Sequence, residues 1–458
     1  MLSDAIVALA TPPGRSAIAV VRLSGDDALE IAGRVVDAVH TAAPRTATLA
    51  TFRAADGTPI DRGLVTVFRA PHSYTGDDLV ELSCHGGLAV PARLLAALQA
   101  AGARPAAPGE FTRRAVLNGK LDLVQAEAVG DLIDATAPAQ ARTALAQLEG
   151  GLSRRLGELR EALVEVNALL GYEIDFPEED DGPVPRDRIR GRLDNVGERI
   201  DRLLATSSAG ERLREGALVV LAGRPNAGKS SLFNALLGNA RALVTAVPGT
   251  TRDAIEVPVD VAGWPVRLID TAGLWDSADP IDQLGIAVTR RWLTAADLVL
   301  VCVEGSRALG EDERELAVSA AALVVRTKSD LWTAPALAPA TAPAPPAAAA
   351  GFDAPVPVSA LSGSGLDTLR SAIAFRLFGD RAVLADLEPV LTRERHRAAL
   401  AAARDALRAA RPHLVPGGDA VLAAHHVRLA TTALDELLGA VDIEEVLGRV
   451  FASFCVGK

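Results

Sequence analysis

The residues best suited to chemistry lie in one short loop near the middle of the 458-residue chain. The segment Gly223–Ser230 reads GRPNAGKS and fits the pattern G-x-x-x-x-G-K-[ST]. Glycines at this spacing let backbone N–H groups close around phosphate oxygens, and the start of a following helix adds partial positive charge. We expect Lys229 to reach the β- and γ-phosphates of a nucleotide and the Ser230 hydroxyl to ligate Mg²⁺. The loop residues predicted to contact the nucleotide are Asn226, Ala227, Gly228, Lys229, Ser230 and Ser231.

Two strings further along the chain carry oxygen atoms suited to the same magnesium ion. Asp270 begins the run DTAG after the apolar stretch Val266–Ile269, where its carboxylate can hold a water of Mg²⁺. Thr251, in the run GTTRD, is the expected second hydroxyl ligand from a switch loop, and the Gly273 N–H can meet the γ-phosphate. The residues assigned to GTP in these strings are Gly249, Thr250, Thr251, Asp270, Thr271, Ala272 and Gly273.

Two later strings predict the site for the base. The run TKSD from Thr327 resembles the guanine-specifying pattern N-K-x-D of Ras-like GTPases, and SAL from Ser359 resembles the loop whose backbone N–H meets guanine O6. The Asp330 carboxylate offers two acceptors to the N1–H and 2-amino group of guanine, which adenine cannot match. The residues assigned to the base are Thr327, Lys328, Asp330, Ser359, Ala360 and Leu361.

The chain departs from the Ras-like pattern at two positions. Thr327 stands where these enzymes usually carry Asn, so we expect weaker GDP affinity than Asn would give, with guanine preference retained through Asp330. Leu274 follows the DTAG run where Ras-like enzymes place a water-orienting Gln. An apolar side chain cannot orient water, so another group must do so.

The pattern of the first 120 residues predicts an α+β domain. Short apolar runs between turn signals indicate strands, and longer periodic stretches indicate helices. The expected strands are Ala5–Ala10, Ala17–Leu23, Gly63–Phe68 and Leu79–Cys84, and the expected helices are Glu30–Val39 and Val90–Ala101.

From Leu121 to Leu213 the apolar spacing becomes helical, with a break over Gly171–Pro185 that contains an acidic run. The positions expected on apolar helix faces include Leu145, Leu148, Leu152, Leu156, Leu159 and Leu163, and later Leu434, Leu437, Leu438 and Val441. Helical spacing returns near Leu384, on the other side of an α/β stretch. We therefore expect one discontinuous helical domain whose two halves pack together around an inserted domain.

The inserted stretch has the alternation of strands and helices that is typical of a doubly wound α/β domain. Its expected strands are Leu218–Ala222, Val266–Ile269, Leu298–Val303 and Leu323–Val325, with a helix over Ser230–Leu237. Residues 333–350 are almost entirely Ala, Pro and Thr, which predicts a flexible surface insertion. The predicted domain boundaries are 1–120, 121–215, 216–380 and 381–458.

Composition excludes several classes of protein. The formal net charge is −11, so the whole chain does not attract nucleic acid or anionic membranes by its charge. Three cysteines cannot build a disulfide framework or a four-thiolate zinc site. No apolar run reaches the ~18 residues of a membrane span, and the start MLSD has no signal-peptide layout, so we expect a cytoplasmic protein.

Lysine is unusually rare: 47 basic residues include only Lys120, Lys229, Lys328 and Lys458. Arg serves wherever a generic surface cation suffices, so a lysine indicates a position that needs a compact ammonium. Two of the four fall in the strings assigned above to the nucleotide.

The chain as a whole resembles the bacterial MnmE (TrmE) family of tRNA-modification GTPases. The resemblance rests on TPPGR from Thr11, the loop Gly223–Ser231, the run Gly249–Asp253 and the terminal FCVGK from Phe454. It implies an α+β N-terminal folate-binding domain that also forms the dimer, a discontinuous all-α helical domain and an inserted Ras-like α/β P-loop GTPase domain. The last of these would be the G domain.

The resemblance also implies a site for 5-formyl- or 5,10-methylene-tetrahydrofolate. Its residues would be Arg22, Glu81, Lys120 and Lys458, with Cys455 as a nucleophile or acid/base toward the one-carbon unit. A buried structural role for Cys455 stays open. His85, in the run CHGG, is interpreted as a turn histidine rather than a catalytic one.

For the GTPase, the resemblance implies activation by K⁺. The ion would lie beside Asn226 and the loop Thr245–Thr250, ligated by Asn226, Thr245, Val247 and Thr250, with Ala246 and Pro248 in the same nucleotide-binding loop. The catalytic position that matches the family's Glu is Asp282 here. Asp is one methylene shorter, and Asp279 is the alternative if Asp282 does not orient the attacking water.

Together with the nucleotide strings, the resemblance implies a homodimeric GTPase that builds aminomethyl-type groups at C5 of the tRNA wobble uridine. Its expected partner is the FAD-dependent protein MnmG, in a heterotetramer that handles tRNA and no membrane. Two alternatives remain: a ribosome-assembly GTPase of the Era or Der type, and a folate-binding protein with a degenerate G domain. The first shares every nucleotide string but lacks the N-terminal extension and the terminal FCVGK.

Overall fold

The computed structural model describes residues 4–176, 185–238, 256–270, 291–305, 307–319, 322–332, 354–379 and 389–439, together with Phe454 and Gly457. The chain forms two compact units. The first contains Met1–Gly130, Gln147–Leu193 and Ala406–Lys458, and the second contains Asp131–Ala146 and Asp194–Asp405. The boundaries fall inside four helices, which are α4 (Leu123–Asp134), α5 (Pro138–Leu148), α7 (Arg186–Ala205) and α13 (Glu394–Ala410).

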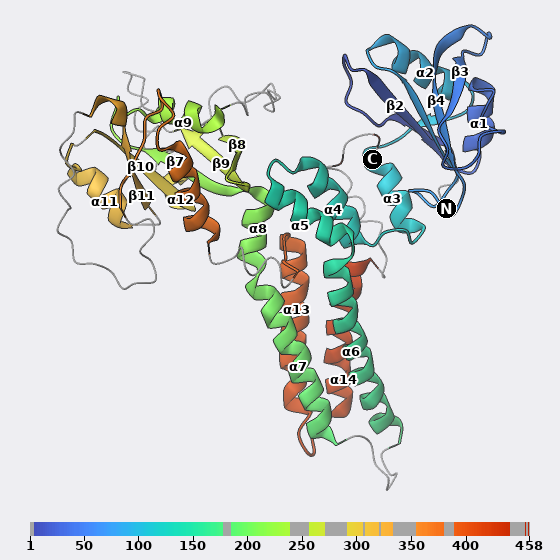
Figure 1. Cartoon of the computed structure of the whole chain (residues 1–458). Coiled ribbons are helices and arrows are strands. Elements are labelled where there is room, and N and C mark those ends of the chain that lie inside the picture. Colours follow the sequence, from blue (N-terminus) through green and yellow to red (C-terminus); the bar gives the residue numbers. More distant parts are fainter. Residues whose placement is uncertain are drawn as a thin grey trace, which may run out of the picture. The chain divides into compact units, whose positions relative to one another are not determined.

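The N-terminal part of the first unit is a six-stranded sheet with the order β3-β4-β5-β2-β1-β6 (Figure 1). Its strands are β1 (Ile6–Leu9), β2 (Ile18–Ser24), β3 (Thr48–Arg53), β4 (Pro59–Phe68), β5 (Leu79–His85) and β6 (Arg104–Pro105). All neighbours pair antiparallel except β1 and β6. Four of these strands agree with the predicted ones, whereas β3 and the two-residue β6 were not predicted.

Two helices, α1 (Ala28–Val35) and α2 (Ala89–Ala100), contribute to the core of this sheet. Val21 and Leu82 are fully buried in that core together with Leu94 of α2. Successive side chains of a strand point to opposite faces, so the neighbours Arg22 and Glu81 point to the face away from this core. The register pairs Arg22 directly with Glu81. One face of β2 and β5 therefore stabilises the domain, and the other presents polar groups.

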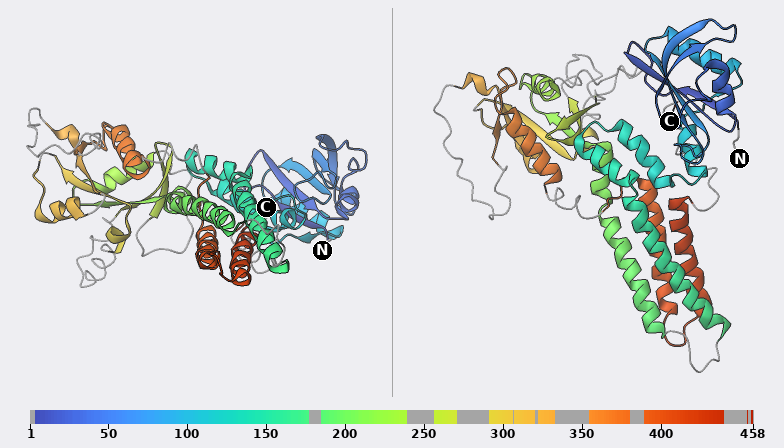
Figure 2. Two further views of the ribbon diagram at one scale, coloured as in Figure 1. Left: turned by 90° about the horizontal axis from the view of Figure 1, so that it is seen from below. Right: turned by 45° about the vertical axis from the view of Figure 1, so that its right-hand side comes forward.

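The helical part of the first unit brings together segments from both ends of the chain. Helix α6 (Gly151–Asp175) packs along α14 (Ala420–Leu438), as both views in Figure 2 show. The buried positions of α6 follow helical spacing and are Leu152, Leu156, Leu159, Leu163, Val166 and Leu170. Arg160 of α6 pairs with Asp435 of α14. This pairing of distant helices confirms that the helical domain is discontinuous.

Two helical expectations were wrong. Helix α6 continues through Gly171 and ends at Asp175, so the predicted break begins later than expected. A glycine inside a helix costs only about 1 kcal/mol, which the packing along α14 offsets. Leu145 was expected on an apolar face, yet 46% of it is exposed. Its neighbour Ala144 is buried instead, so the buried face of α5 is rotated by one position.

The second unit contains a mostly parallel sheet with the order β12-β11-β10-β7-β9-β8. Its strands are β7 (Ala217–Ala222), β8 (Glu256–Val261), β9 (Trp264–Asp270), β10 (Leu298–Glu304), β11 (Ala322–Thr327) and β12 (Val356–Pro357). Only β8, at the edge, pairs antiparallel. The helices besides those above are α8 (Ser207–Glu215), α9 (Lys229–Leu237), α11 (Glu311–Ser319) and α12 (Leu366–Phe378).

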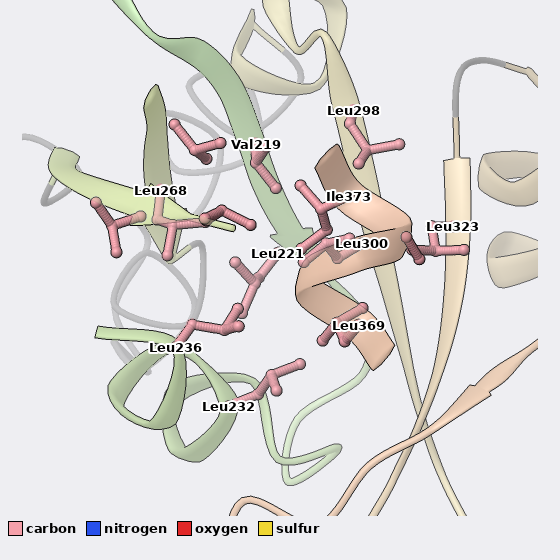
Figure 3. Packing of buried hydrophobic residues seen from close by; sticks show 14 of the residues in the cluster. Val219, Leu221, Leu232, Leu236, Leu268, Leu298, Leu300, Leu323, Leu369 and Ile373 are labelled. Atoms are coloured by element: carbon pink, nitrogen blue, oxygen red, sulfur yellow. The ribbon is translucent and has the colours of Figure 1, made fainter. Parts of the chain in front are cut away.

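Every residue of β7 is buried, because a central parallel strand is covered on both faces. Figure 3 shows Leu232 and Leu236 of α9 and Leu369 and Ile373 of α12 packed with Leu221 and its strand neighbours. The fold class predicted from the sequence is thus confirmed: an α+β N-terminal part, a discontinuous helical part and an α/β P-loop part. Strands β8 and β12 were not predicted. Thr245, Val247 and Asp282 lie outside the described residues.

In the described part of the chain, every helix is too short or too polar to cross a lipid bilayer.

Candidate functional site

The phosphate loop has the geometry that its sequence predicts. It joins the buried strand β7 to α9, and Gly228 is the residue before the helix, with φ of +84°. Gly223 has φ of +142°, and a Cβ there would lie 2.4 Å from the carbonyl oxygen of Cys302. Only glycine combines that backbone angle with so close an approach. The loop therefore leaves β7 in close contact with the adjacent strand β10 and leads directly into α9.

Lys229 is the buried cation of this loop. Its Nζ donates to the carbonyl oxygens of Gly223 and Arg224, at 2.9 and 3.0 Å. The ammonium thus lies against the loop that precedes it, and the residue is only 5% exposed. A buried ammonium needs such oxygen partners, and phosphate oxygens are stronger acceptors of the same kind. Ser230 is exposed at the start of α9, and the exposed Asn226 has φ of +63°.

Asp270 lies at the same edge of the sheet as this loop. Strands β7 and β9 are adjacent and parallel, and Leu221 pairs with Asp270 in their register. Because β7 continues directly into the loop at Gly223, the carboxylate stands beside the point where the loop begins. This is the carboxyl end of a parallel sheet, where ligands bind in doubly wound folds.

The two strings predicted to bind the base form loops that a backbone hydrogen bond joins. The Ser329 N–H donates to the Val358 carbonyl at 3.2 Å, directly before the buried Ser359. Asp330 is exposed, so its carboxylate can accept from a base. Ala360 is half-buried, whereas Leu361 is 88% exposed.

Thr327 has a contact that the sequence analysis did not foresee. Its hydroxyl donates to the carbonyl oxygen of Ala227 at 2.6 Å, and the residue is buried. It therefore connects the base loop directly to the phosphate loop. Next to it, the Nζ of Lys328 lies 2.9 Å from an oxygen of Glu304, the last residue of β10. The sequence gives no local signal for Glu304, since its partner is 24 positions further along the chain.

Some nucleotide predictions lie outside the described residues. They are Thr245, Ala246, Val247, Pro248, Gly249, Thr250, Thr251, Thr271, Ala272, Gly273 and Asp282.

The second candidate site surrounds Arg22 in the first unit. The Glu81 Oε1 accepts from both Nε and Nη2 of Arg22, at 3.0 and 2.7 Å. The side chains are 15% and 27% exposed. Two charge-assisted hydrogen bonds to one oxygen hold the plane of the guanidinium in place. The structure thus brings together two of the predicted folate residues, which are 59 positions apart in the sequence.

Two aromatic rings lie beside the same guanidinium. The Arg22 Cζ is 5.5 Å from the centre of the Tyr74 ring and 5.7 Å from that of Phe111. Both distances are within the range of cation–π attraction. The Tyr74 hydroxyl lies 2.8 Å from that of Thr112, and burial raises the pKa of Tyr74, so the phenol stays neutral. The sequence analysis missed both rings, although Tyr74 is one of only two tyrosines in the chain.

The C-terminal end reaches this site through Gly457. Its carbonyl oxygen lies 3.5 Å from Nη1 of Arg22. Phe454, three residues earlier, packs on a small cluster that contains Val116 and Leu123. Cys455 and Lys458 lie outside the described residues.

Lys120 and His85, which were also considered from the sequence, each have a polar partner in the structure. The Nζ of the exposed Lys120 donates to the Pro71 carbonyl at 3.0 Å, on the loop that also carries Tyr74. His85 is the last residue of β5 rather than part of a turn, and its Nδ1 lies 2.9 Å from Asp61. Burial opposes ionisation of Asp61, but hydrogen bonds from His85 and Arg62 leave its pKa below the usual value.

Comparison with known proteins identifies the family of the chain. Residues 5–120 match the family model described as "GTP-binding protein TrmE N-terminus", and residues 123–455 match the model "MnmE helical domain". The "tRNA modification GTPase MnmE" of Moorella thermoacetica is 42% identical over 467 residues, with all of both chains covered. The protein of the same name from Phenylobacterium zucineum is 44% identical over 475 residues, again with full coverage of both chains.

Among solved structures, the G domain of the T. maritima FeoB iron transporter covers 35% of this chain and 98% of that one, at 24% identity and a TM-score of 0.23. A likeness this small adds nothing to the assignment. The matches to the relatives run over the whole length, including the extension before the phosphate loop, which argues against a ribosome-assembly switch. The chain therefore belongs to the MnmE family of tRNA modification GTPases.

Proposed function

We propose that this protein is a K⁺-activated GTPase that takes part in building aminomethyl-type groups at C5 of the tRNA wobble uridine. The one-carbon unit would come from 5-formyl- or 5,10-methylene-tetrahydrofolate, and an FAD-dependent MnmG partner would supply the redox chemistry. The observation that carries the proposal is that one chain contains both a P-loop followed by a guanine-type base loop and the paired Arg22 and Glu81. The reaction on the wobble uridine is inferred from membership of the family.

The described P-loop residues suit magnesium and a nucleoside triphosphate. Mg²⁺ prefers hard oxygen ligands, and the Ser230 hydroxyl and the Asp270 carboxylate lie at the same edge of the sheet. Ser230 would ligate the ion directly, Asp270 would hold one of its waters, and Thr251 would add the second hydroxyl. When bound, the ion neutralises charge on the β- and γ-phosphates. Lys229 adds a second positive charge at the same phosphates.

The base loop would select guanine. The exposed Asp330 offers two acceptor oxygens, and the Ser359 loop is bonded to the backbone beside it through Ser329. Adenine has no matching pair of donors, so its binding would leave the carboxylate without partners. The exposed Asn226 amide, with Thr245, Val247 and Thr250, would supply the oxygen ligands of K⁺. Asp282 would orient the attacking water.

The Arg22 site would hold the folate. The Glu81 Oε1 accepts from Arg22, and its Oε2 would accept from N–H donors of a pterin ring. Arg22 keeps N–H groups for an acidic or carbonyl oxygen of the ligand, and Tyr74 and Phe111 offer ring faces. Lys120 and Lys458 would add positive charge for the folate carboxylates. Cys455 would act on the one-carbon unit.

The proposed division of work follows the predicted boundaries. Residues 1–120 would bind folate and form the homodimer, residues 216–380 would bind and hydrolyse GTP, and the two helical stretches, 121–215 and 381–458, would connect them. We place the protein in the cytoplasm, in a heterotetramer with MnmG. A net charge of −11 supports a complex in which the partner provides much of the tRNA-binding surface.

The test is mass spectrometry of tRNA nucleosides from a strain that lacks this protein. Restoring the wild-type gene should restore 5-aminomethyl-type wobble uridines. Asp330→Ala should not restore them, because guanine recognition is lost. The matched control is Asp367→Ala, which removes an exposed carboxylate at the start of α12 that pairs only with Arg370 three positions later, as far as the described residues show. Unchanged uridines in the deletion strain would refute the proposed function.

A further inference from the structure

The guanidinium of Arg22 is surrounded on several sides by groups from distant parts of the first unit. Glu81 on the neighbouring strand holds one edge, and the rings of Tyr74 and Phe111 lie within 6 Å of the Cζ atom. The carbonyl oxygen of Gly457 approaches Nη1. The first three contacts come from the N-terminal 120 residues, but Gly457 is separated from Arg22 by 435 positions.

The tail occupies one of the N–H donors of the Arg22 guanidinium. A guanidinium has five N–H groups. Within the described structure, Nε and one N–H of Nη2 are directed to Glu81, and one N–H of Nη1 faces Gly457. One N–H on each Nη then remains for a ligand. The tail carbonyl thus limits which donors of Arg22 a ligand can use, and it places partial negative charge beside the cation.

Gly457 can approach this closely because it has no side chain. Its φ is +100°, a conformation that L side chains rarely adopt. A Cβ at this position would lie 2.4 Å from the carbonyl oxygen of Leu9 and 3.0 Å from the Cα of Ala10. Both are backbone atoms at the end of β1. Leu9 pairs with Val21 of β2, so this backbone cannot move aside without breaking the sheet next to Arg22.

We propose that Gly457 is a positioning residue of the Arg22 site: its missing side chain lets the C-terminal tail dock on β1 and set its carbonyl against the guanidinium. This inference rests on the proposed folate function of the site. The tail then acts on the ligand through Arg22, and docking of the tail and the orientation of Arg22 support each other. Any side chain at position 457 would lift the tail from β1.

The experiment measures binding of 5-formyl-tetrahydrofolate to the full chain by calorimetry. Gly457→Ala should weaken binding about three- to tenfold, because the tail no longer orients the guanidinium; at 3.5 Å the contact is long, so it contributes less than the roughly 1.5–3 kcal/mol of a well-formed hydrogen bond to a charged group. The matched control is Gly417→Ala. Gly417 also has a positive φ, +77°, but a Cβ there would meet nothing within 4 Å. The control should change folate affinity less than about twofold. Equal affinities of Gly457→Ala and wild type would overturn the inference.

A second measurement separates positioning from general damage. Hydrogen exchange of the peptide that contains residues 454–458 should become at least about threefold faster in Arg22→Gln, because the tail loses the cation that its carbonyl faces. GDP affinity should stay unchanged in both Gly457→Ala and Arg22→Gln, since the nucleotide residues belong to the other compact unit. Unchanged hydrogen exchange of the tail in Arg22→Gln would show that docking of the tail does not depend on Arg22 and would contradict the inference.

The outcomes also distinguish this inference from the function on which it rests. If wild-type protein does not bind 5-formyl-tetrahydrofolate, the folate part of the proposed function fails, and with it the role of Gly457. If wild type binds and Gly457→Ala binds equally well, the proposed function stands and only the positioning role is refuted.

Discussion

Removing the Thr327 hydroxyl tests whether the base loop holds the phosphate loop in shape. The substitution is Thr327→Val, which keeps the volume and branching of the side chain but cannot donate to the Ala227 carbonyl at 2.6 Å. Thr327 is 4% exposed, so water cannot readily replace the lost donor. Ala227 lies directly before Gly228, the residue that precedes α9, so the affected carbonyl belongs to the phosphate-binding loop itself.

The size of the effect follows from the cost of an unsatisfied buried acceptor. That cost is about 1–3 kcal/mol, equivalent to roughly 5- to 150-fold in an equilibrium constant. Part of this cost is the same in the free and the nucleotide-bound protein and cancels. Only the remainder lowers the affinity for GDP. We therefore expect GDP to bind about tenfold more weakly to Thr327→Val. The preference for guanine over adenine should persist, because it depends on Asp330 rather than on this hydroxyl.

The assay is GDP titration by calorimetry, supported by the dissociation rate of a fluorescent GDP. Thr327→Ser keeps the hydroxyl and should bind within about threefold of wild type. Thr431→Val is the matched control elsewhere in the chain. Thr431 is also buried, and its hydroxyl donates to the backbone carbonyl of Val427 at 3.0 Å within α14. It should leave GDP affinity unchanged.

Equal GDP affinities of Thr327→Val and Thr327→Ser would refute this reasoning, since they differ in the hydroxyl. Thr327→Asn tests the related expectation from the sequence. Asn adds a donor for the base, so GDP should bind more tightly than in wild type. Unchanged affinity would mean that Thr327 already supplies all that Asn provides.

Three further predictions concern other parts of the chain. Asp282→Ala should lower GTP turnover at least about tenfold in a phosphate-release assay, and a smaller loss would point to Asp279. Chelation of Mg²⁺, or replacement of K⁺ by Na⁺, should reduce turnover in the same assay and recover on adding the ion back. Glu110 is buried, which opposes its ionisation, but Arg104, the Ala107 N–H and Arg114 together lower its pKa. Its charged form therefore contributes stability at pH values above the pKa of Glu in the unfolded chain, which is about 4.3. This contribution is lost as the pH falls from that value through the lower pKa of the folded state. Glu110→Gln should destabilise the N-terminal domain by about 3 kcal/mol at pH 7 and weaken this acid dependence, measured by hydrogen exchange of β6 and α3 (Glu110–Leu117) in urea.

The nucleotide site was predictable because most of its chemistry is local in sequence. The strand, glycine turn and helix around Lys229 follow one another within a few residues, and each has its own signal in residue type and spacing. Predicted strands such as Leu298–Val303 agree with β10 to within one residue. Short or edge elements such as β6 and β8 were missed, because pairing with a neighbour rather than residue pattern makes them strands.

The residues proposed to bind folate were a different case. Arg22 and Glu81 were identified by resemblance to a family, and neither has a local signal of its own. Tyr74 and Phe111 were not identified at all, because a ring that contacts a cation across a sheet has the same sequence pattern as a ring in any core. The same holds for the Thr327 hydroxyl, whose acceptor is 100 positions away.

The sequence by itself thus determined the phosphate loop, the fold class of each part and most of the buried helical faces, since each depends on residues a few positions apart. Tertiary structure alone decided that α6 packs on α14, that Arg22 meets Glu81 across two strands, and that Gly457 reaches both β1 and Arg22. Contacts of this kind depend on strand register and on the close packing of backbone atoms. Neither leaves a periodic trace in the chain, so only the folded molecule shows which distant residues work together.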